Sequence, residues 1–306
     1  MTAHPATDRL LPSRPSRPSP AGQARGGSAR SGSAGLSVRA RPVVRAVFGV
    51  LLVLWILVPL VPLALWSVAD RWQAPAVLPN AYSLDAFAVL GAPGTLSAAA
   101  SSLLLGSAVA IIATPLGLMG ALAARALPGR YGRAVDLILL LPLAVPPFAL
   151  VMGANITLLR LYVPPFAGVV LLLVVIALPY TAFMFRSALA TYEQRFEDVA
   201  LTLGADPRQV LRHVRMPLLS AATVRAFFLA FLVGWGDYIT TLLVGGGQLT
   251  TLPMLLGSAA SSTGNEQLVA VLSLAVIVPP AFILAAVTLP AVITTRAAAL
   301  TRKAHP

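Results

Sequence analysis

One carboxylate lies in an apolar stretch where a charge is costly. Asp237 is part of FLVGWGDYITTLL, in the outer half of the fifth of six apolar segments. A charge near the bilayer centre costs about 2.5–3.5 kcal/mol on insertion scales, so it usually faces a cavity or a partner. Trp235 and Tyr238 are close in sequence, and an aromatic ring beside a carboxylate suits an organic cation. These three residues are the candidate substrate path; the alternative is a structural Asp237 that pairs with a neighbouring helix or lies at the outer interface.

A polar stretch between two long apolar segments is the second candidate site. It covers residues 192–217 and reads YEQRFEDVALTLGADPRQVLRHVRMP. Apolar residues recur from Phe196 to Leu203 at i, i+3, i+4 and i+7, which predicts one face of a helix. Gly204 follows where a helix C-terminus favours a residue without Cβ. Pattern alone leaves an ordinary amphipathic loop and a docking site equally open.

A second helix is expected directly after this turn. Asp206 is placed as its N-cap and Pro207 at its first position, where a missing N–H costs nothing. Arg208 and Arg212 share one face of it. We expect Pro217 to end this helix.

Catalytic chemistry is not expected. A P-loop needs a lysine after its glycines, and the single lysine, Lys303, lies in the C-terminal tail without such glycines. His4 and His305 are terminal and His213 lies in the polar loop, so no histidines converge on a metal or catalytic site. There is no GxSxG elbow and no cysteine. We therefore expect no catalytic residue, no metal site and no cofactor bound by this chain.

The composition is that of a membrane protein. The chain has 306 residues, of which 58% are hydrophobic and 10% are charged, whereas soluble domains carry about 25% charged residues. The bilayer must be the solvent for much of the chain. The net charge of +12 does not indicate nucleic acid as a partner, because the basic residues lie in a tail and in short loops between apolar runs.

Three regions follow from this composition. Residues 1–41 are rich in Arg, Ser, Pro, Gly and Ala and cannot bury enough surface to fold, which predicts a disordered basic cytoplasmic tail. This tail is either simply solvated or in contact with anionic lipid. Residues 42–300 are expected to form an all-α domain of six transmembrane helices, and residues 301–306 a short C-terminal cytoplasmic tail.

The apolar segments and the basic residues between them predict the topology. A span needs about 20 residues, and the segments lie near 44–69, 94–124, 132–155, 166–190, 218–245 and 267–295. Alternate sides of this arrangement hold 20 and 2 basic residues. The positive-inside rule then places both termini and the polar loop in the cytoplasm.

The prolines and the segments between spans predict where helices break and where short elements form. The pairs Pro146–Pro147 and Pro279–Pro280 are the strongest candidates for breaks inside spans. The first external connection, 70–93, is expected to hold a short strand or helix. Residues 250–256 of the fifth connection are expected to form a short element on the outer side.

The polar loop resembles the EAA loop of ABC-importer permeases, E-A-A-x3-G-x9-I-x-L-P. Ala200, Gly204 and Pro217 match that pattern outright. Asp198 stands for the Glu and Val199 for the first Ala, whereas Val214 stands for the Ile and Met216 for the Leu. The departures keep charge or apolar character.

This resemblance implies a type I, MetI-like permease fold and a set of partners. In that family the loop docks in a groove of separate ATP-binding cassette ATPase subunits, which bind ATP and Mg²⁺ and drive the membrane helices. The implied packing and turn residues are Ala200, Leu203 and Gly204, and the implied polar contacts are Asp198, Arg208 and Arg212. The resemblance also implies a second permease subunit, an extracytoplasmic solute-binding protein and the cell (plasma or inner) membrane of a bacterium.

A second resemblance concerns the solute. Residues 235–256, WGDYITTLLVGGGQLTTLPMLL, look like permeases of the spermidine/putrescine branch, whose relatives carry phosphonates, iron or other small solutes. A polyamine or a similar small organic solute is expected. A sugar permease, a stand-alone secondary transporter that uses Asp237, and a membrane scaffold without transport remain as alternatives.

Overall fold

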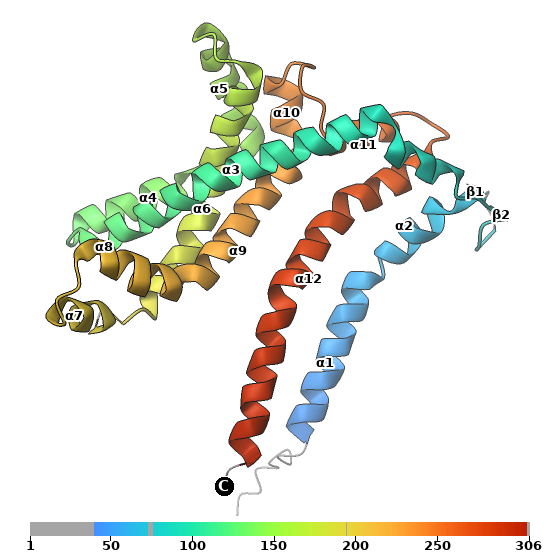
Figure 1. Cartoon of the computed structure of the whole chain (residues 1–306). Coiled ribbons are helices and arrows are strands. Elements are labelled where there is room, and N and C mark those ends of the chain that lie inside the picture. Colours follow the sequence, from blue (N-terminus) through green and yellow to red (C-terminus); the bar gives the residue numbers. More distant parts are fainter. Residues whose placement is uncertain (1–39, 73–75, 194, 305–306) are drawn as a thin grey trace, which may run out of the picture. The chain divides into compact units, whose positions relative to one another are not determined.

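The computed structural model describes residues 40–72, 76–193 and 195–304. The predicted tail, residues 1–41, lies almost entirely outside them. The described residues are overwhelmingly helical (Figure 1). Helices are required here because lipid offers no partner for backbone N–H and C=O groups, which a helix satisfies internally.

The chain divides into two compact units, Met1–Leu54 and Trp55–Pro306. Helix α1 (Ala40–Leu57) contributes the described part of the first unit. The second unit contains every element from α2 (Leu60–Ser67) onward.

Three long helices form the centre of the second unit: α3 (Pro93–Ala126), α6 (Pro165–Ala190) and α9 (Met216–Trp235). All three pack against one another (Figure 1). Small residues make this approach possible, as membrane helix interfaces require. At the crossing of α3 and α9, a Cβ added to Gly234 would lie only 2.7 Å from Gly106 Cα.

Two groups of buried side chains lie between these helices. The first, which we call the upper cluster, includes Leu105, Val169, Leu173, Phe231 and Trp235. The second, which we call the lower cluster, consists of Ala121, Phe185, Leu189, Leu219, Ala222 and Ala226. The lower cluster lies at the ends of α3 and α6 and at the start of α9, next to the polar loop.

The six predicted apolar segments correspond to four continuous helices and two broken pairs. Within the part of the chain that the structure describes, the helices long and apolar enough to cross a membrane are Pro93–Ala126, Pro165–Ala190, Pro207–Trp235 and Glu266–Ala286. The broken pairs, Ala46–Leu57 with Leu60–Ser67 and Arg130–Ala144 with Pro147–Arg160, raise the number to six if each is one span.

The predicted third span, 132–155, is not one straight helix. Helix α4 (Arg130–Ala144) and helix α5 (Pro147–Arg160) meet at 98°. Val145 is extended, as the residue before a proline prefers, and Pro147 occupies the start of α5. The break expected at Pro146–Pro147 is thereby confirmed.

The break expected at the other proline pair is wrong. Helix α12 (Glu266–Ala304) runs through Pro279 and Pro280 without interruption. Each proline removes only its own N–H donor, and helices that pack in a membrane tolerate such a loss. A proline pair therefore breaks a helix only where the preceding residue also leaves the helical conformation, as Val145 does.

The predicted fifth span, 218–245, is also divided. Helix α9 ends at Trp235, and the short helix α10 (Ile239–Val244) begins after a three-residue connection. Asp237 lies in this connection rather than inside a helix, and it caps α10 as described below.

The first and fifth connections contain the expected short elements. Strands β1 (Ala69–Arg71) and β2 (Ala81–Tyr82) pair antiparallel, and the 3₁₀ helix η1 (Asp85–Gly91) follows. In the fifth connection, helix α11 (Leu252–Ala260) covers the predicted element. Its first N–H, on Leu252, donates to Ser102 Oγ of α3 at 2.9 Å, which ties the connection to the central helices.

Candidate functional site

The polar loop folds as its sequence predicts, into a helix, a turn and a second helix. Helix α7 (Arg195–Thr202) ends in a turn where Gly204 adopts φ +86°. The N–H of Gly204 donates to Leu201 O at 3.0 Å, and the N–H of Ala205 donates to Ala200 O at 3.0 Å. This is the bond pattern of a Schellman C-cap, which favours glycine because a Cβ is strained at this φ.

The second helix begins as predicted but does not end as predicted. Helix α8 (Pro207–Val210) starts after Asp206, whose N–H donates to Gln209 Oε1 at 2.9 Å in a capping box. It continues into a π turn, η2 (Leu211–Arg215), and then into α9. Pro217 therefore lies in the first turn of α9 and does not terminate the helix.

The π turn explains why the chain stays helical at Pro217. In a regular helix a proline ring crowds the carbonyl four residues earlier. A π turn changes the hydrogen-bond register immediately before the proline, and such turns occur often at functional sites. The loop and α9 are consequently one continuous path of backbone.

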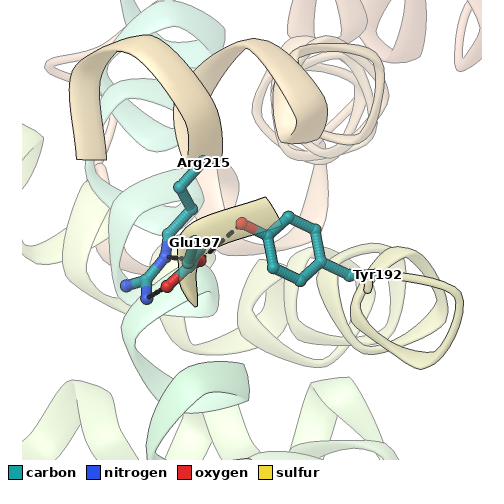
Figure 2. A network of polar contacts seen from close by, with 3 residues as sticks. All are labelled: Tyr192, Glu197 and Arg215. Carbon is teal, nitrogen blue, oxygen red and sulfur yellow. Dashed lines mark hydrogen bonds and ion pairs between the residues drawn. The ribbon is translucent and has the colours of Figure 1, made fainter. Parts of the chain in front are cut away.

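A network of three polar side chains links the two ends of the loop (Figure 2). Arg215 Nε donates to Glu197 Oε1 at 2.8 Å, and Arg215 Nη2 donates to Glu197 Oε2 at 2.6 Å. The Tyr192 hydroxyl donates to the same Glu197 Oε1. The Glu197 side chain is only 13% exposed and that of Arg215 33%, so this bidentate pair is shielded from water and stronger than an ordinary surface pair.

The network shifts the pKa of Glu197 and that of Tyr192. Hydrogen bonding from Arg215 holds the pKa of Glu197 below its ordinary value, although partial burial opposes this. Burial, reinforced by the bond to Glu197, raises the pKa of Tyr192 to about 12. Glu197 is therefore ionised and Tyr192 neutral across the physiological range.

Further arginines bind the ends of the central helices to this region. Arg125, in the last turn of α3, donates from Nη1 to Leu189 O of α6 at 2.7 Å. Its guanidinium lies 6.0 Å from the centroid of the Tyr192 ring. Arg186 pairs with Asp136 at 2.9 Å, which joins α6 to α4. An open cavity of about 370 Å³ is lined by Arg125, Asp136 and Arg186. The charged groups of these residues are bound to one another or to Leu189 O through the contacts just described.

Most of the predicted coupling residues face outward. Leu203 is 82% exposed, and the other exposed members of the set are Asp198, Val199, Gly204, Arg208, Arg212 and Pro217. Ala200 and Val214 are half-buried. Phe196, Val199 and Leu201 are also at least 47% exposed, and several exposed apolar side chains on one loop suit a partner.

Sequence reasoning missed the three residues of the network. Glu197 and Arg215 are 18 positions apart, beyond any local helical spacing. The sequence does contain acidic residues before the predicted turn and basic residues after it, and such residues can form ion pairs across a turn. That signal does not single out Glu197 from the neighbouring acids or Arg215 from the neighbouring arginines.

Asp237, the candidate path residue, caps α10. Its Oδ2 accepts hydrogen bonds from the Thr241 N–H at 2.7 Å and the Thr241 hydroxyl at 2.9 Å. Its Oδ1 accepts one longer bond, from the Thr240 N–H at 3.3 Å. The carboxylate is half-buried and lines an open cavity of about 440 Å³ formed with residues of α5, α6, α9 and α10.

The two aromatic neighbours of Asp237 differ in placement. Trp235 is 6% exposed, stacks on Phe231 and donates from Nε1 to Val276 O of α12 at 2.9 Å. It belongs to the upper cluster and does not line the cavity. Tyr238 does line the cavity, and its ring lies against Gly257 of α11.

Metal chemistry finds no support in the described part of the chain. Among those residues no group of three or more His, Cys, Asp or Glu side chains is placed to hold an ion. A cavity of about 440 Å³ lies at one end of α9, and an exposed amphipathic loop lies at the other.

Comparison with protein families decides the identity. The family described as "Binding-protein-dependent transport system inner membrane component" matches residues 113–299. The chain belongs to this family. It is an inner-membrane permease component of an ABC importer, which confirms the family and the fold class expected from the loop.

The relatives of this permease have different solutes in their names. A Salmonella paratyphi A protein named 2-aminoethylphosphonate transport system permease protein PhnV is 26% identical over 225 residues, covering 72% of this chain and 84% of that protein. The Escherichia coli putrescine transport system permease protein PotI is 30% identical over 95 residues, covering 31% of this chain and 34% of its own length. The Mycobacterium bovis molybdenum transport system permease protein ModB is 29% identical over 187 residues, covering 55% and 70%.

A solved structure shares the fold. It is a chain of a bacterial ABC transporter involved in the import of the acidic polysaccharide alginate, with a TM-score of 0.60. The match covers 83% of the permease and 97% of that chain at 18% identity. This likeness concerns the fold alone.

The hydrogen-bond network predicts that the Tyr192 phenol loses its proton at high pH. In a spectrophotometric titration of the detergent-solubilised protein, which has six tyrosines, Tyr192 should ionise near pH 12. Because its pKa is raised, the contribution of its bond to the folded loop is complete below pH 10 and is lost as pH rises toward 12. Tyr192→Phe should remove one late-titrating phenol from the titration curve. An unchanged late phase in Tyr192→Phe contradicts the assignment.

Proposed function

We propose that this permease forms the solute path of an ATP-driven importer together with a second permease subunit. The single observation that carries the proposal is the exposed amphipathic loop, residues 192–217, which continues directly into α9. A separate ATPase would dock on this loop, bind ATP and Mg²⁺, and drive the central helices. An extracytoplasmic binding protein would deliver the solute from the opposite side.

The docking surface is supported by exposure and chemistry. Leu203 and Val199 present apolar area at 82% and 49% exposure, which a partner would remove from water. Arg208 and Arg212 lie exposed on the following helical turns and supply charge for a polar rim. Gly204 shapes the turn between these two parts of the surface.

The proposed orientation rests on the distribution of basic residues. Placing the loop and both termini in the cytoplasm of a bacterium puts 20 basic residues inside and 2 outside. The same orientation presents the loop to a cytoplasmic ATPase. The hairpin of β1 and β2 and helix α11 would then face the delivering binding protein.

The proposed solute class is a small molecule with a primary ammonium group. Two of the relatives have names that specify such molecules, putrescine and 2-aminoethylphosphonate. In the cavity beside α10, Asp237 supplies a negative charge, and no lysine, arginine or histidine is among the lining residues described. Asp237 Oδ1 accepts only one long bond within the described residues, so a carboxylate lone pair is available to a cation. An oxyanion without an ammonium group, such as molybdate, would meet only repulsion from this carboxylate.

The orientation can be tested by labelling, because the chain has no native cysteine. We expect a membrane-impermeant maleimide to label Leu203→Cys in inside-out vesicles and not in spheroplasts. The matched control is Leu161→Cys, since Leu161 is 68% exposed after α5 and is expected on the outer side. Added ATPase subunits should protect Leu203→Cys alone. Labelling of both cysteines from the same side would contradict the topology.

The solute class can be tested at Asp237. Asp237→Asn keeps the shape and removes the charge, so uptake of radiolabelled putrescine should fall about tenfold or more, the range of a hydrogen bond to a charged group. Thr241→Val is the control, because it removes one hydrogen bond to Asp237 and leaves the charge in place. Unlabelled 2-aminoethylphosphonate should compete with putrescine and molybdate should not. Normal uptake by Asp237→Asn, or competition by molybdate, overturns the ammonium proposal.

A further inference from the structure

Helix α7 contributes no residue to either buried cluster of the membrane helices. None of its residues, Arg195–Thr202, is buried. Phe196 and Val199, its large apolar residues besides Leu201, are 54% and 49% exposed. A helix that carries an exposed docking surface must nevertheless transmit displacement, so its polar contacts matter more than its packing.

Glu197 supplies these contacts from the inner face of α7. Its two oxygens accept the bidentate pair from Arg215 at 2.8 and 2.6 Å, and Oε1 also accepts the Tyr192 hydroxyl (Figure 2). Such a pair fixes orientation as well as distance, because both N–H vectors of the guanidinium fork are engaged. The carboxylate is therefore held by two side chains from two different elements.

Both of those side chains lie next to an end of a central helix, Tyr192 after α6 and Arg215 before α9. The Tyr192 ring, just beyond the end of α6, packs against the lower cluster. Arg215 is the last residue of the π turn and directly precedes α9, whose Leu219, Ala222 and Ala226 are members of that same cluster. Arg125 joins the end of α3 to this point through Leu189 O and the Tyr192 ring.

We infer that Glu197 is the positioning residue that transmits motion of the docked loop to α6 and α9, through Tyr192 and Arg215 respectively. The inference rests on the proposed function, since it assigns a task within ATPase coupling. Leu203 and the exposed arginines bind the partner, whereas Glu197 faces inward and converts displacement of α7 into displacement of the lower cluster. Docking and transmission are thus carried by different residues of one loop.

The test separates docking from transmission. Two cysteines, Leu84→Cys and Leu161→Cys, both at sites 68% exposed, carry spin labels in the otherwise cysteine-free chain. The tagged protein is purified with its co-purifying ATPase, and the distance distribution is measured with and without Mg²⁺-ATP. In the parent protein we expect nucleotide to shift the distribution.

Glu197→Gln should retain the ATPase at parental stoichiometry, yet the ratio of shifted to unshifted populations should fall about tenfold, within the usual range of coupling between sites. The matched control is Glu193→Gln, because Glu193 is an exposed acid of the same loop. The double exchange Glu197→Arg with Arg215→Glu should recover part of the shift. Tyr192→Phe, which removes only the hydroxyl, should give an intermediate loss.

Three results would overturn the inference. A full nucleotide-dependent shift in Glu197→Gln would show that transmission does not use this carboxylate. Loss of the ATPase from Glu197→Gln would assign the residue to docking or to the stability of the loop. Equal loss in the single variants and in the charge exchange would exclude the ion pair as the linkage. If the parent protein carries no ATPase at all, the proposed function itself fails, and that outcome is distinct from the other three.

Discussion

Close packing of α3, α6 and α9 is the constraint on which the rest of this permease depends. In lipid there is little hydrophobic force between helices, so their association relies on close contact at small residues and on buried hydrogen bonds. The approach of Gly234 to Gly106 provides one such contact, and the bond from Trp235 to Val276 O provides another link, to α12. Because α9 has 20 residues, it extends about 30 Å. It therefore connects the polar loop at its start with the Asp237 cavity at its end.

The charged residues Glu197, Arg215 and Asp237 lie near the two ends of the packed central helices. At one end the pair between Glu197 and Arg215 is shielded and bidentate, which suits an element that must keep its shape while it is displaced. At the other end Asp237 caps α10 and also faces a cavity. These roles are compatible, because Thr241 donates both its N–H and its hydroxyl to Oδ2, whereas Oδ1 accepts only the longer bond from the Thr240 N–H. The two readings of Asp237, structural and functional, are therefore not exclusive.

The sequence predicted the features that depend on local chemistry. Gly204 and the Asp206–Pro207 cap define the turn of the loop through backbone conformation and short-range hydrogen bonds, and the structure reproduces both. The break before Pro147 follows from the same local rules.

The continuous passage through Pro217 and through Pro279–Pro280 was not predictable, because a π turn and the surrounding helices decide whether a proline ends a helix. The bond between Glu197 and Arg215 is a tertiary contact, and no periodicity reports it. Family membership establishes transport, but the relatives' names specify three different solutes. The solute of this permease must therefore be inferred from the residues that line its cavity.

The most direct measurement of the central claim is a gentle detergent purification of the tagged chain from its own membranes, followed by mass spectrometry of the proteins that accompany it. The account predicts an ATPase with a Walker motif. It also predicts loss of that ATPase when Gly204, whose φ of +86° excludes an unstrained side chain, is replaced by Asp while membrane insertion is retained. A chain that purifies without any ATPase at low and high salt, and whose uptake collapses with the ion gradient instead, would contradict the account and identify a stand-alone transporter.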